Sequence, residues 1–171
     1  VLIMNPLTIM LSLVGIVLVV SYPFMKRFHY LPQAHLGAAF GWSIPMAFAA
    51  QTGTVPIIGW TLFAANVVWS MVYDTMYAMV DREDDILIGI KSTAVLFAHH
   101  DRLAVAILQL LTLLALWAGG LQFGLGWPYN GALWVIAGLF VYHQYLMRER
   151  EPTQCFKAFL HNNWVGLTLF V

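Results

Sequence analysis

The chain has 171 residues, of which 61% are hydrophobic and 9% are charged, and its mean hydropathy is +0.76. Because about a quarter of the residues of soluble domains are charged, this composition indicates a membrane protein. The formal net charge of zero provides no basic surface for phosphate neutralisation and argues against nucleic-acid binding. The single cysteine, Cys155, cannot form an internal disulfide.

Six apolar stretches divide the chain into predicted helices, five complete and one partial. They cover residues 2–24, 31–50, 55–80, 103–123, 129–147 and 164 onward. Each run is continuous rather than alternating, so helices are favoured over barrel strands. The prediction is an all-α, multi-helix transmembrane bundle. Since the last run is shorter than the ~20 residues that span a bilayer, residues 1–171 are expected to be one partial domain, truncated at both ends.

Proline and glycine mark the connections between these stretches. Pro23 precedes the end of the first predicted helix, Pro32 opens the second, and residues 52–56 join the second to the third. Residues 124–130 form the turn between the fourth and the fifth. Within the second stretch, glycines 37 and 41 are spaced for close packing against another helix.

All lysines and arginines fall in the first, third and fifth connections or at their edges. They are Lys26, Arg27, Arg82, Lys91, Arg102, Arg148, Arg150 and Lys157. Odd-numbered connections of an antiparallel bundle share one side of the membrane, and cytoplasmic loops carry the excess of positive charge. Any charged chemistry is therefore expected on the cytoplasmic side.

Three aspartates are predicted to share a face of the third helix. At 100° per residue, Asp74, Asp81 and Asp85 lie within roughly 40° of one another. A carboxylate at membrane depth costs about 2.5–3.5 kcal/mol and is usually kept for function. The polar stripe, expected to face a cavity, continues with Asn66, Ser70 and Tyr77. Because Mg²⁺ commonly binds through one or two carboxylates and substrate phosphates, the pattern favours a phosphate-bearing substrate. Glu83 and Asp84 are expected to be solvated.

These residues also carry a family resemblance. The pattern reads Tyr73-Asp74-Thr75-x-Tyr77-Ala78-x-Val80-Asp81-x-x-x-Asp85, then Ile88-Gly89-Ile90-Lys91-Ser92-Thr93. It resembles the second aspartate-rich motif of the intramembrane aromatic prenyltransferases. Further stretches resemble the bacterial 4-hydroxybenzoate polyprenyltransferase branch of that family, namely residues 22–27, 31–33, 37–45, 155–159 and 162–163.

The resemblance implies a bundle of nine transmembrane helices around a central cavity, of which this chain supplies helices four to nine. It implies Mg²⁺-dependent transfer of a polyprenyl group from polyprenyl diphosphate to 4-hydroxybenzoate, an early step of ubiquinone biosynthesis in the bacterial inner membrane. Two aspartate-rich motifs bracket the diphosphate in this family. Residues 1–73 contain no acidic residue, so the first motif is expected in an N-terminal half that precedes this chain, and the chain alone is expected to be inactive.

By the same resemblance, Asp81 and Asp85 are expected to hold the metal, and Arg27 to contact an anionic substrate. Arginine suits bidentate recognition of carboxylate or phosphate. The catalytic set is expected to be Asp74, Asp81 and Asp85, with Asp81 the candidate for assisting loss of the ring proton. The remaining residues expected to bind substrate are Lys26, Tyr77, Arg82 and Lys91.

Other functions fit less well. A cation transporter would carry charge deeper in the bundle, often with internal repeats. A CDP-alcohol phosphotransferase would carry an Asp-Gly-x-x-Ala-Arg core, which is absent. Residues 90–93 lack the glycine that a phosphate-binding P-loop requires before its lysine. The adjacent histidines 99 and 100, beside Asp101, are expected in a solvated loop. Homogentisate, haem or menaquinone-type acceptors remain open on physical grounds.

Overall fold

The computed structural model describes residues 3–170, and over this range it contains helices and no strands, which confirms the all-α prediction. The start of the first predicted stretch, at residue 2, lies outside the described residues. The elements are α1 (Pro6–Phe28), α2 (Pro32–Gly41), α3 (Ser43–Thr52), α4 (Ile57–Val80), α5 (Arg82–Leu87), α6 (Thr93–Phe97), η1 (Ala98–His100), α7 (Asp101–Phe123), α8 (Trp127–Leu146), η2 (Met147–Glu149) and α9 (Pro152–Phe170).

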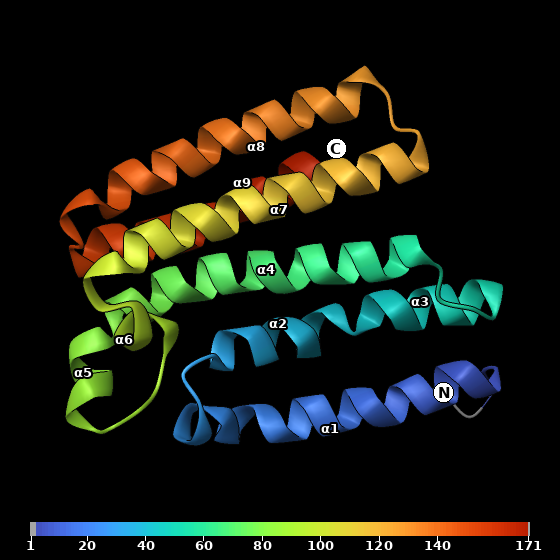
Figure 1. Cartoon of the computed structure of the whole chain (residues 1–171), viewed down its shortest axis with the longest axis horizontal. Coiled ribbons are helices and arrows are strands. Elements are labelled where there is room, and N and C mark those ends of the chain that lie inside the picture. The colour runs from blue at the N-terminus through green and yellow to red at the C-terminus, as the bar shows by residue number, and fades with distance from the viewer. Residues whose placement is uncertain (1–2, 171) are drawn as a thin grey trace.

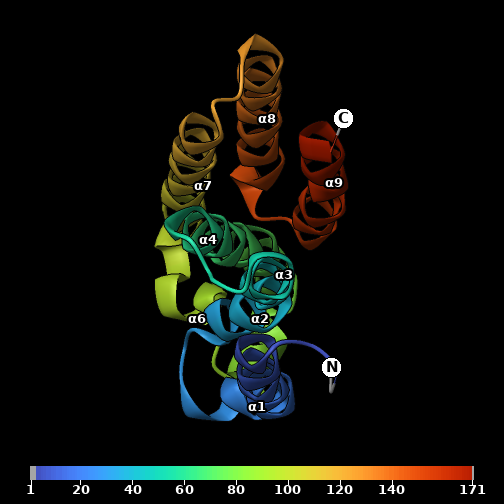
Figure 2. The same cartoon turned by 90° about the vertical axis from the view of Figure 1, so that its right-hand side faces the viewer.

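The long helices lie side by side around α4 (Figure 1). On one side of α4, helices α7, α8 and α9 complete a four-helix group; on the other side, α2 with α3 and then α1 form two further layers (Figure 2). The short helices α5 and α6 cluster at one end of this assembly (Figure 1). That end also holds the C-termini of α1, α4 and α8.

The second predicted helix is interrupted. Residues 31–50 were expected to form one helix, but α2 ends at Gly41 and α3 begins at Ser43. Pro45 has no N–H, so the carbonyl of Gly41 lacks its usual helical donor. At the break, the indole N–H of Trp42 donates to the Leu11 carbonyl of α1 at 2.8 Å. Each ten-residue helix is about 15 Å long, half of the ~30 Å hydrocarbon core, and the two follow one another beside α4 (Figure 1).

Within the described residues, three segments are long and apolar enough to cross a membrane: Pro6–Phe28, Ile57–Val80 and Thr93–Phe123. This number is smaller than the five complete spans expected from the sequence, in part because the break at Trp42 divides the second predicted helix into two short ones. The sixth prediction was also too short, because α9 begins at Pro152 rather than at 164. Its first half is amphipathic, with Cys155 and Ala158 buried among polar neighbours, and this pattern hid the helix in a search for continuous apolar runs.

Helices α2 and α4 are in backbone contact. A Cβ atom added to Gly37 would lie 2.9 Å from both the Val67 carbonyl oxygen and the Ser70 Cβ, and one added to Gly41 would lie 2.6 Å from Asn66 Nδ2. The predicted close-packing role of the two glycines is confirmed. This contact fixes the distance between the layer that α2 and α3 form and the helix that carries Asp74.

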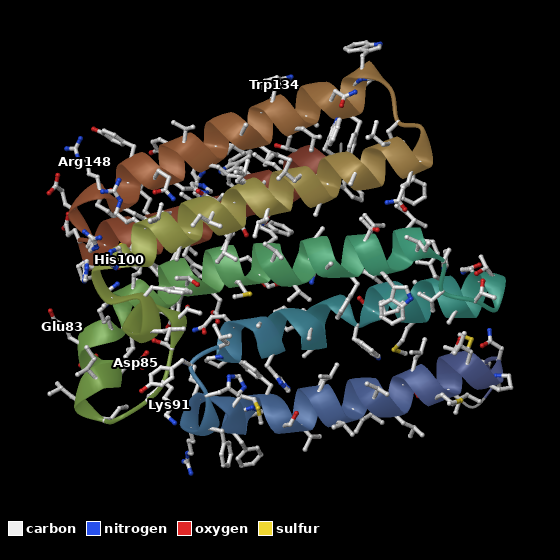
Figure 3. All side chains as sticks on the ribbon, in the orientation of Figure 1. Glu83, Asp85, Lys91, His100, Trp134 and Arg148 are labelled. Atoms are coloured by element: carbon white, nitrogen blue, oxygen red, sulfur yellow. The ribbon has the colours of Figure 1, made fainter. Side chains whose placement is uncertain are left out.

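The basic residues gather at one end of the bundle, as the sequence predicted. They lie in the last turn of α1, in the α4–α7 connection, at the start of α7 and around the α8–α9 turn. Figure 3 shows Lys91, Arg148, Glu83, Asp85 and His100 together at this end, with Trp134 far along α8. The candidate site is at this charged end.

Candidate functional site

The acidic turn, residues 81–85, lies where α4 ends and α5 begins. Helix α4 ends at Val80, and Asp81, with φ −90° and ψ 5°, is both its C-cap and the N-cap of α5. The uninterrupted helix that the sequence predicted through Asp85 is therefore broken at Asp81. The Asp85 N–H still donates to the Asp81 carbonyl at 2.8 Å, so one helical turn joins the two aspartates.

Asp85 is the buried member of the acidic turn, with 6% of its surface exposed, whereas Glu83 and Asp84 are exposed as predicted. Glu83 points away from the bundle (Figure 3). Burial raises the pKa of the Asp85 carboxyl; the Ser92 hydroxyl and the Lys26 charge oppose this shift, and the charges of Asp81 and Asp84 add to it. A cation close to Asp85 would therefore stabilise the charged form of its carboxyl group.

Lys26 brings positive charge to the aspartates from another helix. It lies in the last turn of α1, and its ammonium charge acts on both Asp74 and Asp85. The charge of Asp81 acts on the same two carboxylates. The structure thus brings Lys26, Asp74, Asp81 and Asp85 into one electrostatic environment, built by α1, α4 and the α4–α5 junction.

Lys91 closes the C-terminus of α1. Its backbone N–H donates to the Lys26 carbonyl at 2.9 Å, and its Nζ donates to the Phe28 carbonyl at 3.1 Å. The ammonium also lies 5.4 Å from the centre of the Tyr30 ring. An ammonium has three N–H donors, so this arrangement leaves capacity for an anion while it ties the α5–α6 connection to α1.

Two buried hydrogen bonds extend this attachment to α2 and α4. The Thr93 N–H donates to Gln33 Oε1 of α2 at 3.2 Å, and the Thr93 hydroxyl is 2.8 Å from that of Thr75 on α4. Since all three side chains are buried, these bonds replace water that the groups would otherwise bind. The segment after the acidic turn is held by three helices.

Arg82 has a protein partner. Its guanidinium pairs with Asp101, the first residue of α7, which also accepts from Arg150 Nε at 2.9 Å. The structure therefore favours a structural role for Arg82 over the expected contact with diphosphate. Histidines 99 and 100 are exposed as predicted, but Asp101 is fully buried. Sequence reasoning missed it; an acidic residue opening a long apolar helix was the available signal.

The predicted polar stripe is split between two neighbours of α4. Asn66 donates to the Gly37 carbonyl of α2 at 3.3 Å and also lines a cavity of about 190 Å³ beside α4 and α7, whereas Ser70 is buried against α2. Tyr77 packs on α9, where the centre of its ring lies 5.2 Å from the centre of the Phe159 ring. The stripe fails as a single cavity face because the helices on both sides of α4 use its small and polar residues for packing.

Arg27 is exposed at the end of α1, and no described residue forms a hydrogen bond or ion pair with its side chain. Its five N–H donors are available for an anionic ligand.

The metal-binding capacity of this end is partial. Among residues 3–170, no group of three or more His, Cys, Asp or Glu side chains is arranged to hold a metal ion. Asp81 and Asp85, one turn apart, supply the hard carboxylate oxygens that Mg²⁺ prefers, and Mg²⁺ commonly completes its shell with water and phosphate. The residues present fit a contribution of two carboxylates to such a site.

A groove runs between α4 and α9 beside this end. Its volume is about 380 Å³, and its walls include Trp69, Tyr73, Phe159 and Asn162. The Trp69 indole donates to Asn162 Oδ1 at 3.2 Å, which satisfies both groups inside the bundle. Tyr73, which lines the groove, directly precedes Asp74 in the sequence of α4.

Comparison with known proteins identifies the family. Residues 1–165 match the UbiA prenyltransferase family. The chain belongs to this family. The match confirms the family expected from the aspartate-rich motif, and together with the long apolar helices it makes the chain an integral membrane protein.

Similar curated proteins include two described as 4-hydroxybenzoate octaprenyltransferase. The one from Saccharophagus degradans is 59% identical over 167 residues, which are 98% of this chain and 56% of the relative. The one from Nitrosococcus oceani is 59% identical over 170 residues, 99% of this chain and 60% of the relative. The chain thus spans less than two thirds of the length of these curated relatives.

Among solved structures, the apo structure of a UbiA homolog from Aeropyrum pernix K1 superposes with a TM-score of 0.83. It is 23% identical, and the match covers 98% of this chain and 63% of that one. This likeness supports the fold of the chain.

Proposed function

We propose that the full-length protein transfers a polyprenyl group from polyprenyl diphosphate to the ring of 4-hydroxybenzoate, an early membrane step of ubiquinone biosynthesis. The observation that carries the proposal is the acidic turn, in which buried Asp85 lies one helical turn from Asp81 and faces the charge of Lys26. The names and the 59% identity of the two relatives support the same substrates.

In this proposal Asp81 and Asp85 are the residues that would hold Mg²⁺. When bound, Mg²⁺ would act as a Lewis acid and neutralise charge on the departing diphosphate. Lys26 and Lys91, at the same end of α1, add positive charge for the leaving group. As the allylic carbon–oxygen bond breaks, the ring carbon ortho to the phenol attacks the allylic carbon. The displaced ring proton passes to a nearby carboxylate, Asp81 or Asp74.

Two further features are assigned to the substrates. The exposed Arg27 guanidinium binds the carboxylate of 4-hydroxybenzoate, for which its planar fork is suited. The groove between α4 and α9 takes part of the polyprenyl chain along its aromatic wall, where Tyr77 and Phe159 continue the apolar surface.

The proposal places this chain as helices four to nine of a nine-helix bundle in the bacterial inner membrane. The basic end faces the cytoplasm by the positive-inside rule. Because no group of three or more candidate ligands occurs among the described residues, the proposal assigns the opposing carboxylates to the part of the relatives' length that this chain does not span. The 171-residue chain alone is then inactive.

The test uses membranes that contain the full-length protein, labelled octaprenyl diphosphate, and either 4-hydroxybenzoate or homogentisate as acceptor. Labelled prenyl-4-hydroxybenzoate is expected with Mg²⁺ and is expected to disappear with a chelator. Transfer to homogentisate alone would move the protein to another acceptor class. Absence of any prenylated product from folded protein with Mg²⁺ present would refute the proposal.

A further inference from the structure

A charge cluster centred on a buried aspartate joins three parts of the chain next to the acidic turn. Its centre is Asp101, the first residue of α7, whose side chain has no exposed surface. Asp101 Oδ2 accepts from Arg82 Nη2, while Oδ1 accepts from Arg150 Nε at 2.9 Å and from the Arg102 N–H at 2.6 Å. Both carboxylate oxygens are therefore occupied, by donors from α5, α7 and the α8–α9 turn.

The position of Arg150 depends on this cluster. Its φ of 55° places a non-glycine residue in the left-handed region, which is costly unless the surroundings enforce it. Two side-chain bonds do so, one to Asp101 and one from Nη2 to the His99 carbonyl at 2.5 Å. The α8–α9 turn is thus fixed to the start of α7 by charge-assisted hydrogen bonds.

The cluster differs in kind from the other ion pair at this end. Arg148 pairs with Glu149 at 3.3 Å, and both side chains are more than half exposed. Such exposed pairs contribute little to stability, whereas removal of one partner of a buried pair leaves an uncompensated charge. Arg148 is therefore a matched control for any change made in the cluster.

Apolar packing alone does not fix the acidic turn. Helix α5 has six residues, and its apolar side chains Ile86 and Leu87 are 59% and 81% exposed; Ile88, its C-cap, is 69% exposed. Its far end is attached through Lys91 to α1. Its near end begins at Arg82, the residue that follows Asp81, and the guanidinium of Arg82 is held by Asp101. The direction of the turn thus depends on this ion pair.

We propose that Asp101, with Arg82 and Arg150, is a positioning cluster that holds Asp81 and Asp85 in the orientation required for diphosphate binding. This rests on the proposed function for the meaning of that orientation. Arg82 is then a positioning residue that acts through Asp101 and α5, and the cations that meet the diphosphate are those at the end of α1.

The first test needs neither metal nor substrate. Hydrogen–deuterium exchange of the full-length protein in detergent and chelator is compared for wild type, Asp101→Asn and the control Arg148→Gln. The amide of Asp85 donates to the Asp81 carbonyl, and the amide of Ile90 donates to the Asp85 carbonyl. Both amides are expected to exchange about tenfold faster in Asp101→Asn and at the wild-type rate in Arg148→Gln. Exchange in the middle of α7 should stay at the wild-type rate.

Wild-type exchange at Asp85 and Ile90 in Asp101→Asn would overturn the proposal, as would equal acceleration in α7, which indicates general loosening. If Asp101→Asn does not accumulate as folded protein, Arg82→Lys takes its place, because it keeps the charge and loses the planar fork. The same local acceleration is then expected, and its absence counts against the cluster.

The second test separates this inference from the proposed function. The Mg²⁺ concentration for half-maximal prenyl transfer is expected to rise about tenfold in Arg82→Lys, with the KM for 4-hydroxybenzoate within about twofold of wild type. Wild-type enzyme without Mg²⁺-dependent transfer would refute the proposed function. Active wild type with an unchanged Mg²⁺ curve in Arg82→Lys would refute the positioning role alone.

Discussion

Substitution of Gly37 by alanine tests the contact that sets the separation of α2 and α4. The added Cβ would lie 2.9 Å from the Val67 carbonyl oxygen, against an ordinary contact that begins at 3.4 Å, so the helices must separate by roughly 0.5 Å. Since a backbone atom is in the way, no side-chain rotation relieves the clash. Overpacking of this kind costs about 1–3 kcal/mol.

The assay is thermal unfolding of the full-length protein in detergent, monitored as the fraction of protein that remains monodisperse after heating. Gly37→Ala is expected to lower the midpoint and to reduce prenyl transfer, because α2 also carries the Gln33 amide that accepts from Thr93. Gly138→Ala on α8 is the control: no atom lies within 4 Å of its added Cβ, and alanine favours helix by up to ~1 kcal/mol. Equal midpoints for Gly37→Ala and wild type would refute the packing argument.

Three further predictions concern single groups. Thr75→Val and Thr93→Val should each cost about 1–3 kcal/mol in thermal unfolding, because each strands a buried hydroxyl, and the double variant should lie closer to wild type than the sum; additive losses would contradict this. Arg27→Gln should raise the KM for 4-hydroxybenzoate about 10-fold or more and leave that for the diphosphate unchanged, with exposed Lys157→Gln as a silent control; equal effects on both substrates would exclude the assignment. Asp74→Asn should lower kcat by about 10² or more in folded protein, and near-normal turnover would remove Asp74 from the catalytic set.

The sequence predicted those features of the fold that depend on composition and spacing. Long apolar runs located α1, α4 and α7, and the distribution of lysine and arginine located the charged end. Pro45, four residues after Gly41, is a sequence sign of a bend near Trp42, whereas the contact of the Trp42 indole with the Leu11 carbonyl on another helix could not be predicted. The amphipathic start of α9 was hidden because only its packed side is apolar.

The site was predicted in its chemistry and less in its geometry. Asp81 and Asp85 do lie together, but the angular count failed at Asp81, where α4 ends and a new helix starts. The partners of Arg82 and Lys91 were not predictable, since a charged side chain near a loop gives no sign of whether tertiary neighbours or ligand will receive it. Burial of Asp101 likewise depends on two arginines distant from it in sequence.

The most direct test of the site compares two adjacent carboxylates of α5. Asp85 is buried next to the charge of Lys26, whereas Asp84 is exposed, so the two isosteric changes Asp85→Asn and Asp84→Asn differ chiefly in where the lost charge lay. Prenyl transfer by the full-length enzyme is measured across a range of Mg²⁺ concentrations. Asp85→Asn is predicted to lose about 10²-fold or more in kcat/KM for polyprenyl diphosphate, and Asp84→Asn to stay within about threefold of wild type. Equal activity of the two variants would contradict the assignment of the acidic turn as the diphosphate site.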